Sequence, residues 1–187
     1  MDVKEAIRLR RAYRSLAPVK ITEELIRDLA ESASLSASCF NNQPWRLVFV
    51  KDPGVLAEMH TALSRGNEWV RDASMIVAVF SRKEDDCMIS GREYHQFDTG
   101  MATAFIILRA TELGLVAHPI AGYREKRVKE VLGIPEEMQV ITLVNIGKHS
   151  EILRETLTEE QKAVEGRRPE RLPFEKFAYL DHYTAIK

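Results

Sequence analysis

Arginine is concentrated near the start of this chain to an extent that the overall charge does not explain. Four of the seven residues at positions 8–14 are arginine (Arg8, Arg10, Arg11 and Arg14), whereas the formal net charge of the 187 residues is only −1. Guanidinium groups this close repel one another unless an anion lies among them, and their planar fork matches phosphate oxygens and the polar edge of a conjugated ring. We therefore interpret the cluster as half of an anion-binding site, to which another part of the chain contributes the other half.

A second segment with useful chemistry lies at residues 36–45, where the sequence reads SASCFNNQPW. It combines the hydroxyl of Ser38 with the amides of Asn41, Asn42 and Gln43. Amide side chains offer a donor and an acceptor together, which suits the carbonyl and imide groups of a heteroaromatic ring. Taken alone, the segment is better interpreted as an ordinary loop between a helix and a strand, whose asparagines satisfy turn geometry.

The motifs of several enzyme classes are missing from the sequence. It contains no GxGxxG after a strand, no GxxxxGK followed by serine or threonine, no GxSxG, and no CxxC or HExxH. Cys39 and Cys87 are too few and too unpatterned for a disulfide scaffold, and no metal site is expected. The histidines are scattered and are interpreted as surface or packed residues: His60, His95, His118, His149 and His182. An enzyme without an evident nucleophile or metal is one in which a bound cofactor supplies the chemistry.

Length and composition limit the classes of protein to which this chain can belong. A chain of 187 residues, 45% of them hydrophobic, predicts a single soluble domain with a core (1–148) and a C-terminal arm (149–187). The near-neutral charge argues against a nucleic-acid partner, which would favour a basic face. No uncharged apolar run is long enough to span a bilayer, and the charged N-terminus does not resemble a signal peptide. We therefore expect a cytoplasmic protein without a membrane partner.

Hydrophobic spacing predicts an α+β fold in which helices outnumber strands and the two do not alternate regularly. Thr22 is an expected N-cap, and Gly114 and Gly133 are expected to end helices. Short buried strands are expected at residues 47–50, 75–80 and 140–146, and helices after residues 3, 22 and 53 and over residues 93–113 and 126–132. The polar residues 81–91 are expected to be mobile, and residues 82–94 to form a lid or a surface that faces the substrate.

The two segments together are more specific than either alone. The sequence RRAYR at residues 10–14, followed by SxxNxQPW at residues 38–45, resembles the nitroreductase-like family of FMN-dependent oxidoreductases. Further matches follow in the same order along nearly the whole chain, at residues 71–73, 98–102, 113–115, 119–122, 129–135 and 171–173. The resemblance implies a mostly antiparallel central sheet flanked by helices, with a C-terminal arm that reaches across a homodimer.

The resemblance also implies a set of FMN-binding residues. Arg10, Arg11 and Arg14 would anchor the phosphate and the N1–O2 edge of the ring, and Arg171, with Arg168, would form a second phosphate clamp. A loop from the partner subunit would reach the flavin through Ser38, Cys39, Phe40, Asn41 and Gln43. A backbone segment would run along the ring through Pro119, Ile120, Ala121 and Gly122, where small residues permit a close approach. Ala12 stands within the arginine segment where the family usually has serine, and Ala37, Phe40 and Leu172 also depart from the family pattern.

The implied function is transfer of hydride from NADH or NADPH to a small electrophilic acceptor such as a nitroaromatic compound or a quinone. Both reactants would use the same open face of the flavin in turn, giving ping-pong kinetics without a dedicated catalytic side chain. The helix at residues 93–113 would build the dimer interface, and Tyr94 and Phe97 would face the ring. Two alternatives stay open: a specialised family member that cleaves flavin or dehalogenates an aromatic substrate, and a non-catalytic FMN-binding module.

Overall fold

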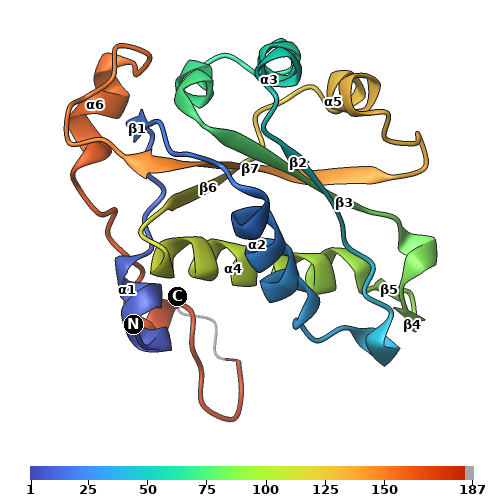
Figure 1. The fold of residues 1–187 in the computed structure, drawn as a ribbon. Helices are drawn as coiled ribbons and strands as arrows, with labels where there is room; N and C mark the ends of the chain where they lie inside the picture. Colours follow the sequence, from blue (N-terminus) through green and yellow to red (C-terminus); the bar gives the residue numbers. More distant parts are fainter. Residues whose placement is uncertain (184–187) are drawn as a thin grey trace.

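The computed structural model describes residues 1–183 and has an α+β fold built on one antiparallel sheet (Figure 1). The five strands lie in the order β1-β7-β3-β2, and β6 also pairs with β7. Every pairing in this sheet is antiparallel. The strand bounds are β1 Leu16–Ala17, β2 Arg46–Val50, β3 Met75–Ser81, β6 Val116–Ile120 and β7 Gln139–His149. A separate hairpin joins β4 Met88–Ile89 to β5 Arg92–Glu93.

Helices cover both faces of the sheet. One face carries α3 and α5, and the opposite face carries α2 and α4, the longest helix (Figure 1). The helix bounds are α1 Val3–Leu9, α2 Glu23–Ser34, α3 Pro53–His60, α4 His95–Glu112, α5 Glu125–Leu132 and α6 Glu159–Glu165. Short 3₁₀ turns lie at η1 Cys39–Asn41, η2 Glu68–Asp72, η3 Lys83–Asp85 and η4 Phe174–Lys176.

The strand β3 is apolar along its whole length because both of its faces are buried. Successive side chains of a strand point to opposite faces. Ile76 and Ala78 therefore belong to the core on the α3–α5 side. Val77 and Val79 belong to the core on the α2–α4 side. A helix layer on each face thus explains the continuous apolar run that predicted this strand.

The local signals for helix ends are confirmed. The Thr22 hydroxyl accepts a hydrogen bond from the backbone N–H of Leu25 at 3.2 Å, which caps α2. Gly114 and Gly133 follow α4 and α5 with φ of +75° and +65°, in the left-handed region that glycine adopts without steric cost. The predicted strands and helices up to residue 149 are present, with ends that differ by up to three residues.

Several elements were not predicted from the sequence, and β6 and α6 are the longest strand and the longest helix among them. β6 is short and contains His118 and Pro119, so it lacks the apolar pattern of a strand. The helix α6 is mostly polar and is stabilised at its start by a capping box between Thr158 and Gln161. β6 owes its structure to its pairing with β7, which a local pattern does not contain, whereas the capping box of α6 is a local signal that the sequence analysis missed.

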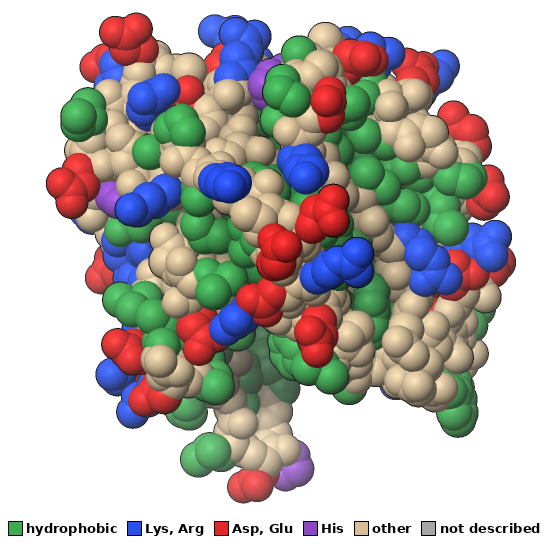
Figure 2. Space-filling view, viewed as in Figure 1, with side chains coloured by type: hydrophobic (Ala, Val, Ile, Leu, Met, Phe, Trp, Pro, Cys, Tyr) green, Lys and Arg blue, Asp and Glu red, His purple; other side chains and the backbone are tan. Residues whose placement is uncertain are grey.

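The expected arm at residues 149–187 is described as far as residue 183, and this described portion divides into two parts with different surroundings. The first part folds back on the core: Arg154 forms a salt bridge with Asp72 at 3.1 Å, and the Gln161 side chain donates to the Gly66 carbonyl at 2.7 Å. The second part projects from the body of the molecule below α1 (Figures 1 and 2). Its large apolar side chains are mostly exposed: Leu172, Phe174, Phe177, Leu180 and Tyr183. Within residues 1–183, no helix is both long enough and apolar enough to cross a membrane.

Candidate functional site

A cleft lined by arginines lies where the N-terminal and C-terminal segments meet. Its volume is about 150 Å³, and six of its ten lining residues are arginine. Arg10, Arg11 and Arg14 come from the segment after α1, and Arg167, Arg168 and Arg171 follow α6. The other lining residues are Ala12, Val164, Glu165 and Pro169. Two charge clusters that lie about 160 residues apart in the sequence therefore form one site.

The protein only partly balances the positive charge in this cleft, because the ten lining residues include six arginines and one carboxylate, Glu165. Within residues 1–183, none of the six arginines forms a salt bridge. Burial lowers the pKa of Arg10 from its usual value, and the nearby charges of Arg168, Arg171 and Arg11 lower it further. Like charges held this close are destabilising until an anion enters among them. The cleft is therefore suited to bind a phosphate or a group of similar charge.

The buried carboxylate of Glu165 holds the backbone that carries the N-terminal arginines. One carboxylate oxygen of Glu165, at the end of α6, accepts hydrogen bonds from the backbone N–H groups of Arg14 at 2.7 Å and Ser15 at 2.6 Å. The Arg11 guanidinium donates to the Glu165 carbonyl at 3.2 Å. Glu165 is only 4% exposed, so these bonds are shielded from water. Sequence reasoning missed this residue because its partners lie about 150 positions away.

Arg168 and Arg171 have different surroundings. The Arg168 guanidinium donates to the backbone carbonyls of Arg8 and Arg10, so its donors are partly used in holding the N-terminal segment. Arg171 makes no hydrogen bond to other residues of the described chain and lines the same cleft. Arg171 therefore has its full set of donors free for an anion, whereas Arg168 is mainly a positioning residue.

His118 links the predicted backbone segment at residues 119–122 to the arginine segment at residues 10–14. Its Nδ1 is 3.0 Å from the Tyr13 carbonyl oxygen, and its ring packs against Trp69. Burial lowers the pKa of His118 to about 4, so the ring is neutral at pH 7 and Nδ1–H donates to Tyr13. The nearby charges of Arg14, Glu165 and Arg10 also act on this pKa. Residues 119–122 therefore begin beside the arginine cleft.

Gly122 is small for a reason that the sequence did not indicate. A Cβ atom at this position would lie 2.3 Å from Nδ2 of Asn67, whose amide donates to the Gly122 carbonyl at 2.9 Å. The lack of a side chain thus makes room for Asn67. In the same predicted segment Ile120 is buried, whereas Pro119 and Ala121 are exposed.

The loop at residues 38–43 lies away from the arginines of the same chain. The backbone N–H of Cys39 donates to Asp98, in the first turn of α4, at 2.6 Å. By contrast, Ala6 of α1 borders a groove formed with the last turns of α4. Because α4 has 18 residues, its ends are about 27 Å apart. A single chain therefore places His118, just before residues 119–122, beside the arginine segment but leaves this loop at the other end of the helix.

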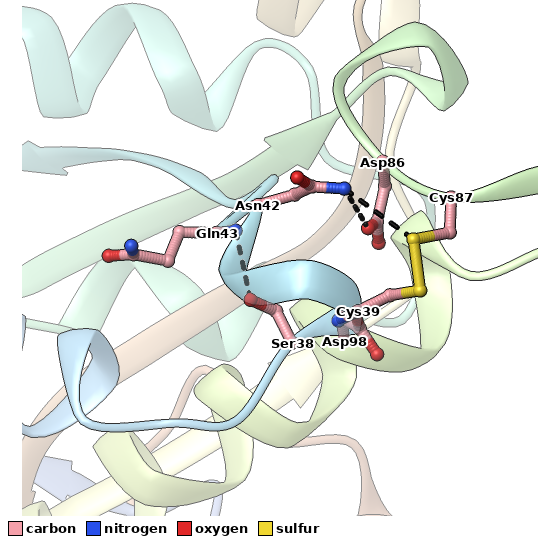
Figure 3. The surroundings of a disulfide bond; sticks show 7 residues. All are labelled: Ser38, Cys39, Asn42, Gln43, Asp86, Cys87 and Asp98. Atoms are coloured by element: carbon pink, nitrogen blue, oxygen red, sulfur yellow. Dashed lines mark hydrogen bonds between the residues drawn. A yellow bond between two sulfur atoms is a disulfide. The ribbon is translucent and has the colours of Figure 1, made fainter.

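A disulfide bond joins this loop to the segment at residues 82–94 (Figure 3). Cys39 in η1 is bonded to Cys87, just before β4. The sequence indicated no such pairing, because 48 positions separate the two cysteines and no pattern connects them. The polar segment at residues 81–91, expected to be mobile, contains η3, part of the β4–β5 hairpin and this covalent connection.

A second polar cavity, of about 520 Å³, lies at the opposite end of the sheet beside His95. The Ser81 hydroxyl is 2.8 Å from Nδ1 of His95, a pairing that is found in some hydrolases. Ser81 is fully buried, however, so its hydroxyl does not face the cavity. The pair is therefore a hydrogen bond within the core and not a nucleophile with its base.

Comparison with known proteins decides the family. The model of the nitroreductase family matches residues 7–67 and 55–148 of this chain. The chain belongs to the nitroreductase family. A relative from Archaeoglobus fulgidus, provisionally named NADH dehydrogenase/NAD(P)H nitroreductase, is 33% identical over 144 residues, covering 74% of this chain and 80% of that protein. An iodotyrosine deiodinase from Haliscomenobacter hydrossis is 26% identical over 171 residues, covering 76% and 77%.

The fold is that of solved nitroreductase-family structures. A crystal structure described as an oxidoreductase containing FMN superposes with a TM-score of 0.85 at 26% identity, covering 100% of this chain and 95% of that one. The nitroreductase family model ends at residue 148. Glu165, Arg168 and Arg171 thus lie beyond the matched residues, so the C-terminal half of the cleft is known from this chain's own structure.

Proposed function

We propose that this nitroreductase-family protein is an FMN-dependent enzyme that transfers hydride from NADH or NADPH to a small electrophilic acceptor, such as a nitroaromatic compound or a quinone. The family match supports an NAD(P)H-dependent oxidoreductase, and the solved relative containing FMN supports the cofactor. The observation that carries the proposal is the convergence of Arg10, Arg14 and Arg171 on one cleft, where none of them forms a salt bridge within the described chain.

The size of the cleft agrees with a phosphate but not with a whole cofactor. Sites for drug-sized ligands usually enclose about 300–1,000 Å³. The arginine cleft encloses about 150 Å³. The phosphate of FMN would therefore bind among Arg10, Arg14 and Arg171, with Arg11 and Arg168 beside it. The flavin ring would extend out of the cleft along residues 119–122.

The residues of this chain would bind and orient the cofactor without acting on the substrate themselves. When bound, FMN takes hydride from the nicotinamide and passes two electrons to the acceptor. Guanidinium charge near the ring favours the negative charge that the cofactor gains on reduction. Both reactants use the same open face in turn, so we expect ping-pong kinetics and assign no catalytic side chain.

A homodimer would complete each site. The loop at residues 38–43 lies at the far end of α4 from the arginines of its own chain. An apolar groove of about 390 Å³ lies between α1 and α4, and the exposed side chains around it include Val3 (71% exposed) and Phe105 (42% exposed). Burial of this face against a second copy would remove apolar surface from water. The same contact would bring Ser38, Asn41 and Gln43 of one protomer toward the flavin of its partner.

The visible spectrum of the purified protein tests this proposal. We expect a bound yellow chromophore that bleaches anaerobically with NADH or NADPH and recovers when a nitroaromatic compound or a quinone is added. Absence of FMN both from the purified protein and after reconstitution would refute the cofactor assignment. Bound FMN without turnover would indicate a non-catalytic FMN-binding module.

Reductive dehalogenation is a second candidate, because one relative is named iodotyrosine deiodinase. The same preparation, reduced and then mixed with iodotyrosine, separates the two reactions. Rapid release of iodide together with slow reduction of nitroaromatic compounds and quinones would favour the dehalogenase.

A further inference from the structure

The disulfide bond joins two segments that the fold otherwise connects only weakly. Cys39 belongs to the loop at residues 38–43, and Cys87 belongs to the segment between η3 and β4 (Figure 3). Phe40, Asn41 and Gln43 in this loop have φ of 47°, 57° and 50°, in the left-handed region that side chains adopt at a cost. Phe40 is 85% exposed, so its ring contributes little packing to hold the loop.

The two sulfur atoms differ in their surroundings. Cys87 is buried, at 8% exposure, whereas Cys39 is partly exposed. The Asn42 side-chain amide lies 3.5 Å from Sγ of Cys87 and donates to it (Figure 3). A donor in this position stabilises negative charge on Cys87 more than on Cys39. Exposure thus favours attack at Cys39, and the hydrogen bond favours departure of Cys87 as a thiolate.

Two carboxyl groups lie beside the sulfurs. An oxygen of Asp86 is within 4.8 Å of both sulfur atoms, and Asp86 also accepts a hydrogen bond from Asn42 at 3.3 Å. Asp98 is 2% exposed, and its carboxylate accepts from the Cys39 N–H. Burial, and then the charge and the hydrogen bond of Asp86, raise the pKa of Asp98, while the hydrogen bond from Cys39 opposes this.

We propose that Cys39–Cys87 is a site of thiol–disulfide exchange, at which a dithiol attacks Cys39 and releases Cys87. A thiolate of the dithiol forms a bond to Sγ of Cys39 as the bond between the two cysteines breaks, and the electron pair goes to Sγ of Cys87. The Cys87 thiolate accepts the Asn42 hydrogen bond and then takes a proton from solvent, which had received the proton of the attacking thiol. The second thiolate of the dithiol then releases Cys39, leaving the dithiol oxidised by two electrons and both cysteines reduced.

Cleavage of the disulfide would loosen the loop at residues 38–43. The effect of this loosening on FMN rests on the proposed function. After cleavage, the loop is held to the neighbouring segments by the Cys39–Asp98 and Asn42–Asp86 hydrogen bonds, without the covalent bond. Because this loop is proposed to contact the flavin of the partner subunit, its release would speed the loss of FMN. The redox state of the two cysteines would then set cofactor retention.

The order of attack is tested by trapping the intermediate in the oxidised full-length protein. The protein is mixed with a limiting amount of glutathione, a monothiol, quenched with acid, alkylated with N-ethylmaleimide and mapped by mass spectrometry. We expect glutathione on Cys39 and N-ethylmaleimide on Cys87. The reverse assignment, equal amounts of both adducts, or a bond that dithiothreitol does not cleave in the folded protein would overturn the proposal. None of these readouts requires bound FMN.

The role of Asn42 is tested by the rate of cleavage. Asn42→Ala removes the donor to Cys87 and should slow cleavage by dithiothreitol about tenfold. Glu84→Gln, in the neighbouring η3, is the matched control and should leave this rate unchanged. If dithiothreitol cleaves the disulfide at the same rate in Asn42→Ala and in the unchanged protein, the assignment of Cys87 as the leaving sulfur is refuted.

The consequence for the loop is measured separately. Dithiothreitol should increase amide hydrogen exchange at residues 38–43 and raise the FMN dissociation rate several-fold, and Cys87→Ser should reproduce both effects without a reductant. Unchanged exchange in both cases would refute control of the loop by the disulfide. If the protein binds no FMN at all, the proposed function fails, while the trapping and exchange results still decide the thiol chemistry.

Discussion

Glu165 offers the sharpest test of how the arginine cleft is built. Its buried carboxylate accepts two short hydrogen bonds, from the backbone N–H groups of Arg14 and Ser15. Hydrogen bonds to a charged acceptor contribute about 1.5–3 kcal/mol each, so Glu165→Ala should lower the free energy of unfolding by about 3 kcal/mol or more. For a domain of this size the melting temperature should fall by roughly 6–12 °C.

Glu165→Gln separates the geometric role of this side chain from its charge. Glutamine keeps an acceptor oxygen but not the charge, so we expect about half of the stability loss of Glu165→Ala. It also removes a negative charge beside the cleft. FMN should therefore bind more tightly to Glu165→Gln, by on the order of 1 kcal/mol, or roughly fivefold. In Glu165→Ala the N-terminal backbone is no longer fixed, so FMN should bind more weakly.

The measurements are chemical unfolding of the FMN-free protein and titration of FMN by fluorescence quenching. Glu160→Ala, on the exposed face of the same helix, is the matched control and should change neither quantity. The reasoning is refuted if the alanine and glutamine variants weaken FMN binding equally while the unfolding free energy stays unchanged. That result would show that the Glu165 carboxylate does not hold the arginine cleft in its folded arrangement.

Three further predictions concern other parts of the site. The pKa of His118 is about 4 in the folded protein and 6.5 when unfolded, so the unfolded chain binds more protons between these values. Stability should therefore fall by up to about 3 kcal/mol as pH drops from 6.5 to 4, and urea unfolding of His118→Asn should show a smaller loss. Arg171→Ala should weaken FMN binding roughly 10- to 100-fold without destabilising the FMN-free protein, whereas Arg168→Ala should lower both affinity and melting temperature. A melting temperature that falls equally in both would contradict their separate roles. Phe105→Glu should give a monomer by light scattering that retains little FMN, and a dimer that retains FMN would exclude the α1–α4 face as the interface.

The sequence by itself determined the class of fold and the family, and it predicted the chemistry of the site. Continuous apolar character predicted β3, and Thr22, Gly114 and Gly133 predicted helix ends, because each of these signals acts through neighbouring atoms of the backbone. The four arginines at positions 8–14 predicted half of an anion site, since clustered guanidinium groups repel one another unless an anion lies among them, and the family resemblance added Arg168 and Arg171. The family resemblance was also available at this level and is confirmed by the family match.

Only the tertiary structure decided which distant residues share an environment. It paired Cys39 with Cys87, placed Glu165 under the backbone of Arg14, and filled the space beside Gly122 with Asn67. It also placed the loop at residues 38–43 about one helix length from the arginines of its own chain. Contacts of this kind depend on how the helices and the sheet pack. They produce no local sequence pattern, because the two partners are separated by many intervening residues.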